Sequence, residues 1–277
     1  MTDFLTVDGG TLAYEVTGAA GPLVVLAHGM GDSRAAFRFM VPALVEAGYR
    51  VAAVDVRGFG KSSVGWASYT RTAIAGDLIA LVKHLGGPAV LIGHSLSGGA
   101  VTIAAAHAPD LVTALVELAP FTRKQSFSIG DLRVAAYRRG MSRLMGTVIL
   151  GSTAQWAKYL EIAYPGTKPA DWDARLKQIT AMLEEPGRMK VLQAMGKVSP
   201  ADAGKQLGNV RCPVLVVQGS RDPDWASPQA EGEAIVADLP KGLGRLVMVE
   251  GAGHYPHVQF PEQTLSAVLP FLAGIRA

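Results

Sequence analysis

Ser95 is the first candidate for chemistry in this sequence, because of the stretch in which it lies. The string GHSLSG (93–98) follows the apolar run AVLI (89–92) and approximates the pattern Gly-x-Ser-x-Gly. That pattern sets a serine on a sharp turn between a strand and a helix, where its hydroxyl projects and the flanking positions must be small. Ser97 replaces the second glycine, but serine is small too. The stretch therefore predicts a projecting nucleophilic hydroxyl, with a simple tight turn as the alternative.

Two further stretches hold the groups that a serine hydroxyl needs in order to react. A serine is a poor nucleophile until an imidazole takes its proton, and the imidazole needs a carboxylate to fix its tautomer and stabilise its charged form. His254 follows the run RLVMVEG in EGAGHYPH, and Asp222 follows VLVVQG in QGSRDPDW. Asp224 is the alternative acid, and its structural interpretation is a carboxylate that caps a turn or a helix. The sequence thus predicts a set of Ser95, Asp222 and His254, in that chain order.

Strand patterns precede each of these three residues. Continuous Val, Ile and Leu runs are typical of strands buried on both faces of a mostly parallel sheet. They occupy 22–29, 49–58, 89–95, 112–120, 212–219 and 245–251. Helical patterns cover 70–85, 96–107, 227–238 and 261–273, and the opening residues predict a hairpin turned at 8–10. Functional groups gather at the carboxyl ends of strands in an open parallel sheet, so we expect an α/β fold with one site at that edge.

The interval from about Phe121 to Val198 interrupts this alternation. It contains no strand pattern, and its apolar residues recur at spacings of three and four. One such series is Val134, Tyr137, Met141, Leu144, Met145 and Val148. We interpret the interval as a helical insertion that covers the sheet.

Positive charge is concentrated in this insertion. Residues 121–198 hold 13 Lys and Arg against 6 Asp and Glu, in a chain whose net charge is +3. Four of the cations fall in or beside one predicted helix: Arg133, Arg138, Arg139 and Arg143. These four arginines can be interpreted in two ways. Either they form a solvated helix face, or they attract an anionic substrate or an anionic surface.

Composition argues against several classes of function. Apolar residues make up 49% of the 277 residues, enough for a sizeable core. The small net charge and the lack of a basic run interleaved with aromatics argue against a nucleic-acid partner. No apolar stretch reaches the length of about eighteen residues that a membrane span needs, and the start MTDFLTVDGG has no secretory signal pattern, so we expect a cytoplasmic location. Cys212, the single cysteine, is predicted to be a buried structural thiol.

Some polar residues outside the predicted set have structural interpretations. The string GFGKS (58–62) imitates the tail of a phosphate loop, but Asp55 stands where that motif requires a glycine, so no nucleotide site is expected. Glu117 lies inside a strand run and is expected to be a structural carboxylate. His257, three residues beyond His254, is expected to form hydrogen bonds around the site without reacting itself.

Taken together, the motifs resemble the cap-bearing serine hydrolase branch of the α/β-hydrolase superfamily. AHGMGDS, DVRGFGKS, GHSLSG, VVQGSRDPD and GAGHYPHVQFPE stand in the family's positions and spacings, and they cover nearly all of the chain outside the insertion. The resemblance implies an α/β-hydrolase fold, with a mostly parallel central sheet, helices on both faces and an inserted helical cap. It divides the chain into a core domain at 1–120 and 205–277 and a cap at 121–204. The order serine, aspartate, histidine is also the family's order.

The resemblance also implies roles for single residues. Ser95 would be the nucleophile, Asp222 the acid and His254 the base. The backbone N–H groups of Met30 and Leu96 would form the oxyanion hole, where two fixed donors contribute about 10²–10³ each in rate. The family's mechanism needs no metal and no organic cofactor. Two further residues match positions that brace loops in the family, namely His28 and Asp55.

We therefore predict a serine hydrolase that cleaves a carboxylic ester or a related acyl compound through an acyl-enzyme. Its small, largely apolar substrate would contact a pocket whose candidate residues are Phe121, Met141 and Met145, although methionine fills ordinary cores equally well. Dehalogenases and epoxide hydrolases are disfavoured, because they carry an aspartate where Ser95 stands.

Other activities fit the same residues. Carbon–carbon bond hydrolases of ring-cleavage products and cofactor-free perhydrolases reuse the same triad. Serine at position 97 also occurs in the branch that resembles bacterial stress-response hydrolases and plant strigolactone receptors. A ligand sensor with slow turnover is therefore the alternative from a different class.

Overall fold

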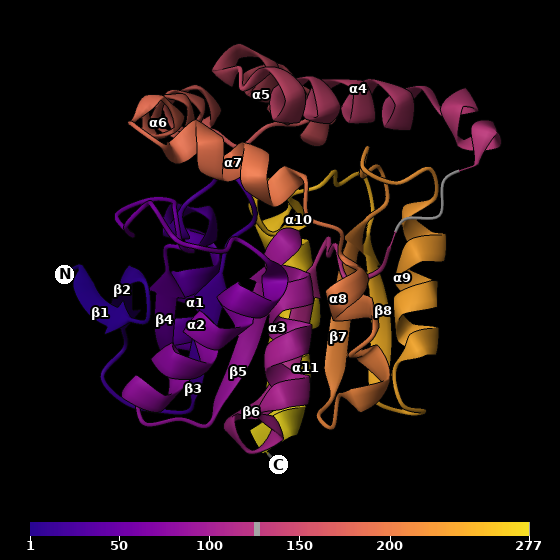
Figure 1. Ribbon diagram of the computed structural model, residues 1–277. Helices are drawn as coiled ribbons and strands as arrows, with labels where there is room; N and C mark the ends of the chain where they lie inside the picture. The colour runs from indigo at the N-terminus through magenta and orange to yellow at the C-terminus, as the bar shows by residue number, and fades with distance from the viewer. Residues whose placement is uncertain (125–127, 277) are drawn as a thin grey trace.

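The computed structural model describes residues 1–124 and 128–276, which form one eight-stranded sheet with helices on both faces (Figure 1). The strands are β1 (Asp3–Val7), β2 (Gly10–Thr17), β3 (Leu23–Ala27), β4 (Arg50–Val54), β5 (Ala89–His94), β6 (Val112–Leu118), β7 (Val214–Gly219) and β8 (Gly244–Val249). The α-helices are α1 (Met40–Glu46), α2 (Arg71–His84), α3 (Leu96–His107), α4 (Ala135–Leu150), α5 (Thr153–Ala163), α6 (Trp172–Glu184), α7 (Arg188–Gly196), α8 (Ala201–Gly204), α9 (Pro228–Asp238), α10 (Pro256–Gln259) and α11 (Pro261–Arg276). Short 3-10 helices are η1 (Arg34–Phe37), η2 (Pro109–Leu111), η3 (Ile129–Arg133) and η4 (Leu207–Asn209).

The sheet is parallel except at one edge. Its strand order is β1-β2-β4-β3-β5-β6-β7-β8, and only the pairings of β1 with β2 and of β2 with β4 are antiparallel. Each strand predicted from an apolar run is present, and β1 and β2 form the predicted hairpin. The α/β-hydrolase fold expected from the motifs is confirmed.

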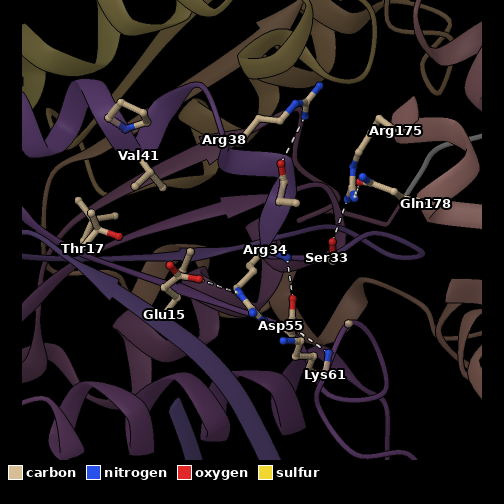
Figure 2. A pocket seen from close by; sticks show the side chains of 15 residues that line it. Glu15, Thr17, Ser33, Arg34, Arg38, Val41, Asp55, Lys61, Arg175 and Gln178 are labelled. Carbon is tan, nitrogen blue, oxygen red and sulfur yellow. Dashed lines mark hydrogen bonds and ion pairs between the residues drawn. The ribbon is translucent and has the colours of Figure 1, made fainter. Parts of the chain in front are cut away.

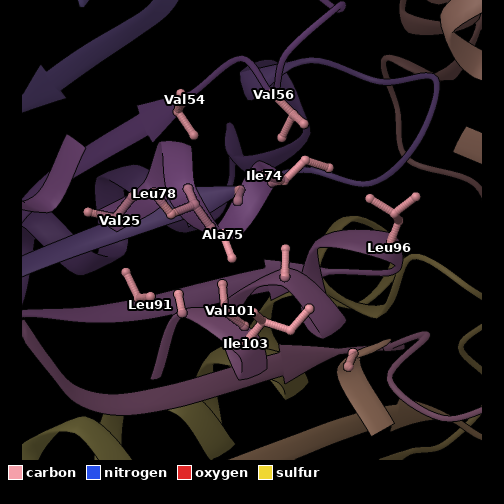
Figure 3. Packing of buried hydrophobic residues seen from close by; sticks show 14 of the residues in the cluster. Val25, Val54, Val56, Ile74, Ala75, Leu78, Leu91, Leu96, Val101 and Ile103 are labelled. Carbon is pink, nitrogen blue, oxygen red and sulfur yellow. The ribbon is translucent and has the colours of Figure 1, made fainter. Parts of the chain in front are cut away.

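The core consists of two layers, one on each face of the sheet. Successive side chains of a strand point to opposite faces. Val25 and Leu91 accordingly pack with Leu78 of α2 and residues of α3 on one face, as Figure 3 shows. Leu26 and Ile92 pack with α1 and α11 on the other face. Because helices cover both faces, the central strands are apolar without interruption. This is why the apolar runs in the sequence predicted the strands.

The predicted insertion is helical in its described part and lies beyond one end of the parallel strands. In Figure 1 α4, α5, α6 and α7 sit together above the sheet, on the side where β5 ends and α3 begins. By contrast, α8 packs against α2 and α3 of the sheet layer. The division into a core domain and a cap domain at 121–204 stays a prediction. No helix within the described ranges is long and apolar enough to cross a bilayer.

Ion pairs fasten the start of α6 to the loops beneath it. Arg38 donates through Nε and Nη2 to the carboxylate of Asp171 at 2.6 and 2.7 Å. Arg175 of α6 pairs with the buried Asp32 and donates to the Ser33 hydroxyl at 2.9 Å. These contacts border a surface hollow of about 560 Å³, shown in Figure 2. None of the predicted site residues lines this hollow, so it is separate from the predicted site.

Candidate active site

The turn at Ser95 has the sharp geometry that its sequence predicts. β5 ends one residue before it and α3 begins one residue after it, and its backbone takes φ 54° and ψ −121°. A residue other than glycine rarely adopts a positive φ, so the surrounding structure must hold this conformation in place. Glycine is required at position 93, because a Cβ there would lie 2.3 Å from the carbonyl oxygen of Ser97. The hydroxyl of Ser95 thus projects from a strained, tightly packed turn.

Ser97, the departure from the glycine pattern, has a specific contact. Its buried hydroxyl donates to the carbonyl oxygen of His28 at 2.6 Å. The next residue, Gly29, approaches so closely that a Cβ there would lie 2.9 Å from the Cβ of Ser95. Ser97 therefore holds the 28–30 segment against the turn. Within the described part of the chain, no hydrogen bond uses the backbone N–H of Met30 or of Leu96.

His254 and Asp222 complete a continuous hydrogen-bonded line with Ser95. Nε2 of His254 lies 2.9 Å from Oγ of Ser95, and its Nδ1 lies 2.9 Å from Oδ2 of Asp222. The same Asp222 oxygen accepts from the amide of Gln218 at 3.0 Å, while its other oxygen accepts from the backbone N–H of Asp224 at 3.0 Å. Asp222 is thereby fixed so that it holds the ring with Nε2 facing the serine.

Asp224, the alternative acid, is also close to the imidazole. Its Oδ2 lies 3.4 Å from Nδ1 of His254, compared with 2.9 Å for Asp222. The same oxygen accepts a hydrogen bond from the hydroxyl of Tyr159, a residue of α5, at 2.6 Å. Geometry therefore favours Asp222 as the partner of the ring, and Asp224 joins the ring to a cap helix.

Two carboxylates beside one imidazole set its charge. Burial disfavours the charged ring, but Asp222 and Asp224 outweigh this effect and raise the pKa of His254 to about 9. Burial and the nearby charge of Asp222 in turn raise the pKa of Asp224, against the opposing effects of His254 and Tyr159. The ring is thus a stronger base than an ordinary histidine.

A cavity of about 170 Å³ opens at the serine, between the turn and the cap helices. All three predicted pocket residues line it, and so do both predicted oxyanion-hole residues. The lining residues are Met30, Arg71, Ser95, Leu96, Phe121, Met141, Leu144, Met145, Val148, Trp156, Tyr159, Met195, Gly196, Val198, Pro200, Asp224, His254 and Tyr255. Most of this wall is apolar, and its one cationic side chain from Lys or Arg is Arg71.

Comparison with known proteins identifies the family. Residues 24–267 match the family described as "Alpha/beta hydrolase family". This chain belongs to the alpha/beta hydrolase family. As a member of it, the chain is an enzyme that acts as a hydrolase.

Individual relatives of this hydrolase cover most of its length. A 2-(acetamidomethylene)succinate hydrolase of Mesorhizobium japonicum is 28% identical over 91% of this chain and 88% of the relative. A pimeloyl-[acyl-carrier protein] methyl ester esterase of Neisseria meningitidis is 29% identical over 91% of this chain and 94% of the relative. Among solved structures, a thermophilic esterase of Thermogutta terrifontis superposes with a TM-score of 0.78 and 25% identity, and covers 100% of both chains.

Two buried histidines of the hydrolase lie behind His254. Nε2 of His94 donates to the backbone carbonyl of His254 at 2.8 Å, a contact that sequence analysis missed. The prediction that His257 forms hydrogen bonds was wrong, because neither of its ring nitrogens has a partner among the described residues. Its ring instead packs 4.7 Å from that of His94 and 5.3 Å from that of Phe37, and burial lowers its pKa to about 3. His94 therefore supports the loop that carries His254 through a hydrogen bond, and His257 supports it through packing.

The structure places the other polar residues discussed in the sequence in structural contacts. His28 accepts from the N–H of Val56 at 2.9 Å, and Asp55 accepts from the N–H of Lys61 at 2.9 Å, so both hold loops. Glu117 is buried and accepts hydrogen bonds from the hydroxyls of Thr102 and Thr122. Cys212 is buried near the start of β7, and burial raises the pKa of its thiol to about 11.

The predicted basic helix is present as α4, but its arginines differ in surroundings. Arg138 and Arg139 are exposed on α4, and Arg133 is exposed on η3 just before it. Arg143 is half-buried and donates to the side chain of Gln155 at 3.1 Å. The exposed basic face therefore consists of Arg133, Arg138 and Arg139.

One cluster in the described part of the chain could hold a metal ion. Asp222, Asp224 and His254 each offer a ligand atom, and these atoms lie within 4.8 Å of one another. Nδ1 of His254 and Oδ2 of Asp222 already share a hydrogen bond. An ion on Nδ1 would displace that bond and leave the ring proton on Nε2, which then could not accept the proton of Ser95, so the cluster fits a proton-transfer site better than a metal site.

Proposed function

We propose that this hydrolase cleaves a carboxylic ester or a related acyl compound through a covalent acyl-enzyme. The observation that carries the proposal is the line from Asp222 through His254 to Ser95, with 2.9 Å at each step, at the wall of an apolar cavity. Nucleophile, base and orienting carboxylate are the three groups that acyl transfer by a serine requires.

The reaction follows from the geometry in two halves. In the first, Nε2 of His254 takes the proton of Ser95 as Oγ attacks the substrate carbonyl, and the ring then gives that proton to the leaving alcohol. In the second, His254 takes a proton from water, the resulting hydroxide attacks the acyl-enzyme, and the proton returns to Oγ of Ser95 as the acid leaves. The N–H groups of Met30 and Leu96 would donate to the oxyanion in both halves.

The oxyanion role of these two N–H groups is supported by position and by their lack of other partners. Both residues line the cavity beside Ser95, and neither N–H donates to another described residue. Ser97 fixes the segment that carries Met30, through its bond to the carbonyl of His28. Two donors that are held before substrate arrives need no reorganisation during the reaction.

Two of the similar proteins support ester cleavage as one activity of this triad. One curated relative is a methyl ester esterase, and one similar solved structure is a thermophilic esterase. A carbon–carbon bond hydrolase, a perhydrolase or a slowly turning sensor would use the same three residues. Kinetics on a series of esters, beside a ring-cleavage product and an acid with hydrogen peroxide, separates these activities.

Covalent labelling tests the proposal directly. A fluorophosphonate should label the protein at one site, and Ser95→Ala should abolish both the label and ester hydrolysis. Ser266→Ala is the matched control, because Ser266 is a serine of α11 whose hydroxyl donates, among the described residues, only to the carbonyl of Gln263. Label that persists in Ser95→Ala, or that is lost in Ser266→Ala, would show that Ser95 is not the nucleophile.

A further inference from the structure

Arg71 is a buried cation in the wall of the proposed active site. It begins α2, its exposed fraction is 4%, and it lines the cavity that contains Ser95. Its Nε donates to the backbone carbonyl of Phe121 at 3.0 Å, and its Nη1 donates to that of Val198 at 3.3 Å. Within the described part of the chain, its Nη2 makes no hydrogen bond and the guanidinium forms no ion pair.

The other buried arginines all have a carboxylate partner. Arg57 pairs with Asp77 through two bonds of 2.7 Å, Arg175 pairs with Asp32, and Arg188 lies 3.2 Å from Glu185. Burying a charge without an opposite charge is costly, which is why buried charges are normally paired. Arg71 is thus the exception among the buried arginines described, and it alone of them reaches the cavity.

The electrostatic surroundings of Arg71 leave its charge incompletely balanced. Burial lowers the pKa of its guanidinium to about 10, and Asp202 is the one carboxylate that acts in the opposite direction. Asp202 accepts instead from the hydroxyl of Thr72 at 3.2 Å and is not within ion-pair distance of Arg71. An anion that entered the cavity would supply the missing charge.

Arg71 is also connected to the nucleophile turn by a short path. The N–H of Phe121 donates to the carbonyl of Ser95 at 3.0 Å, and the carbonyl of Phe121 accepts from Arg71. A Cβ at Gly99, four residues after the serine, would lie 2.7 Å from Cδ of Arg71. The guanidinium is therefore held in place in the wall of the cavity that contains the Ser95 hydroxyl, and one substrate bound in that cavity could contact both groups.

We propose that Arg71 is a specificity-determining residue that binds a carboxylate on the substrate, so that the substrate is a small ester carrying a free carboxylate beside an apolar chain. A guanidinium presents paired N–H donors whose spacing matches a carboxylate, and such bonds are stronger than neutral ones. The apolar wall, with residues such as Leu96 and Met195, accepts the chain between the two groups. This assignment rests on the proposed ester hydrolysis.

Paired substrates test the assignment. The monomethyl esters of succinate, glutarate and adipate carry a carboxylate at three distances from the ester, and the corresponding methyl ester carboxamides, in which an amide replaces the carboxylate, are neutral molecules of similar shape. We expect wild type to prefer at least one anionic ester in kcat/KM, mainly through KM. Arg71→Gln should reduce that preference by about 10- to 100-fold, as the loss of hydrogen bonds to a charged group implies. Arg71→Lys keeps the positive charge but lacks the paired N–H donors of a guanidinium. Its preference for the anionic ester should lie between those of wild type and Arg71→Gln.

Control measurements separate recognition from loss of structure. Arg188→Gln removes another buried arginine, which donates to the carbonyl of Ser62 at 2.6 Å and does not line the cavity, and it should keep the preference. The preference should also persist at high salt. Salt screens exposed charges such as those of Arg138 and Arg139, but it screens a buried charge such as that of Arg71 much less. An unchanged preference in Arg71→Gln, or an equal loss in Arg188→Gln, would overturn the assignment.

A binding experiment keeps the two proposals distinguishable. Glutarate should bind the Ser95→Ala variant in calorimetry, and adding Arg71→Gln should abolish the heat while the melting temperature confirms folding. If neutral esters are hydrolysed through Ser95 but neither substrate pairs nor binding depend on Arg71, this inference fails and the proposed function stands. If glutarate binding depends on Arg71 but no ester is hydrolysed, the proposed function fails and the carboxylate site stands.

Discussion

Replacing Asp224 by asparagine should make the enzyme active at lower pH. His254 must be neutral to accept the proton of Ser95, so kcat/KM rises as pH increases through the pKa of the ring. Asp222 and Asp224 raise that pKa to about 9 against the effect of burial. Asp224→Asn removes one of the two negative charges and leaves the hydrogen bond from His254 to Asp222 in place. The acidic limb of the pH profile should therefore move to lower pH.

The size of the shift follows from the distance. A full charge 3.4 Å from Nδ1 interacts with it by about 5 kcal/mol at an effective dielectric constant of about 20, an upper bound equivalent to about three to four pK units. Asp224 also shares its oxygen with the hydroxyl of Tyr159, which disperses the charge. We expect a downward shift of about one to two units. The measurement is kcat/KM for a neutral methyl ester in a pH-stat, from about pH 5 to about pH 10.

Two further variants fix the interpretation of that profile. Asp222→Asn should lose the orientation of the ring as well as its charge, with a fall of up to ~10⁴ in kcat by analogy with serine proteases. Glu117→Gln is the matched control, because burial raises the pKa of Glu117 to about 7, but it lies outside the cavity. An acidic limb that stays in place in Asp224→Asn, or that moves in Glu117→Gln, would refute the assignment of the limb to His254 and its two carboxylates.

Two other predictions concern charge away from the triad. If the exposed arginines of α4 attract substrate, kcat/KM for an anionic ester should fall more steeply with salt than for the neutral methyl ester carboxamide of the same chain. Replacing Arg138 and Arg139 by glutamine should remove this difference in slope. Equal slopes in wild type would assign these residues to a solvated face. Glu117→Gln should gain stability relative to wild type as pH rises. The folded pKa of Glu117 lies above its ordinary value of 4.5, so the wild-type protein loses up to about 3 kcal/mol between about pH 4.5 and about pH 7. Denaturant unfolding at both ends of this range checks the difference, and a pH-independent difference would contradict it.

The strands and their ends could be predicted from the sequence, because a strand that is buried on both faces of the sheet is a continuous apolar run. Leu91 and Ile92 point to opposite layers, so neither face of β5 can be polar. Ser95 and Asp222 could then be placed at one edge of the sheet, since parallel strands bring their carboxyl ends together. Their hydrogen bonds to His254 required the structure, because a sequence gives the order of residues and not the distances between them.

Arg71 could not be found from the sequence for a physical reason. A cation at the start of a helical pattern normally lies in solvent, and here the neighbouring Thr70 provides the helix cap. Arg71 is buried because Phe121 and Val198, which lie far from it in sequence, bring their carbonyls to its guanidinium. The packing of His257 on Phe37 is similar, since the partner comes from η1, more than two hundred residues earlier.

Helix α5 contacts two groups of the proposed site. Through the bond from Tyr159 to Asp224, α5 holds the second carboxylate beside the imidazole. The carbonyl of Ala163, at the end of α5, accepts from the backbone N–H of His254 at 2.9 Å and so holds the loop of the base. Moving α5 away would break both contacts at once, lower the constraint on the ring and change its charge. The surroundings of His254 and the wall of the cavity therefore depend on the same helix, α5.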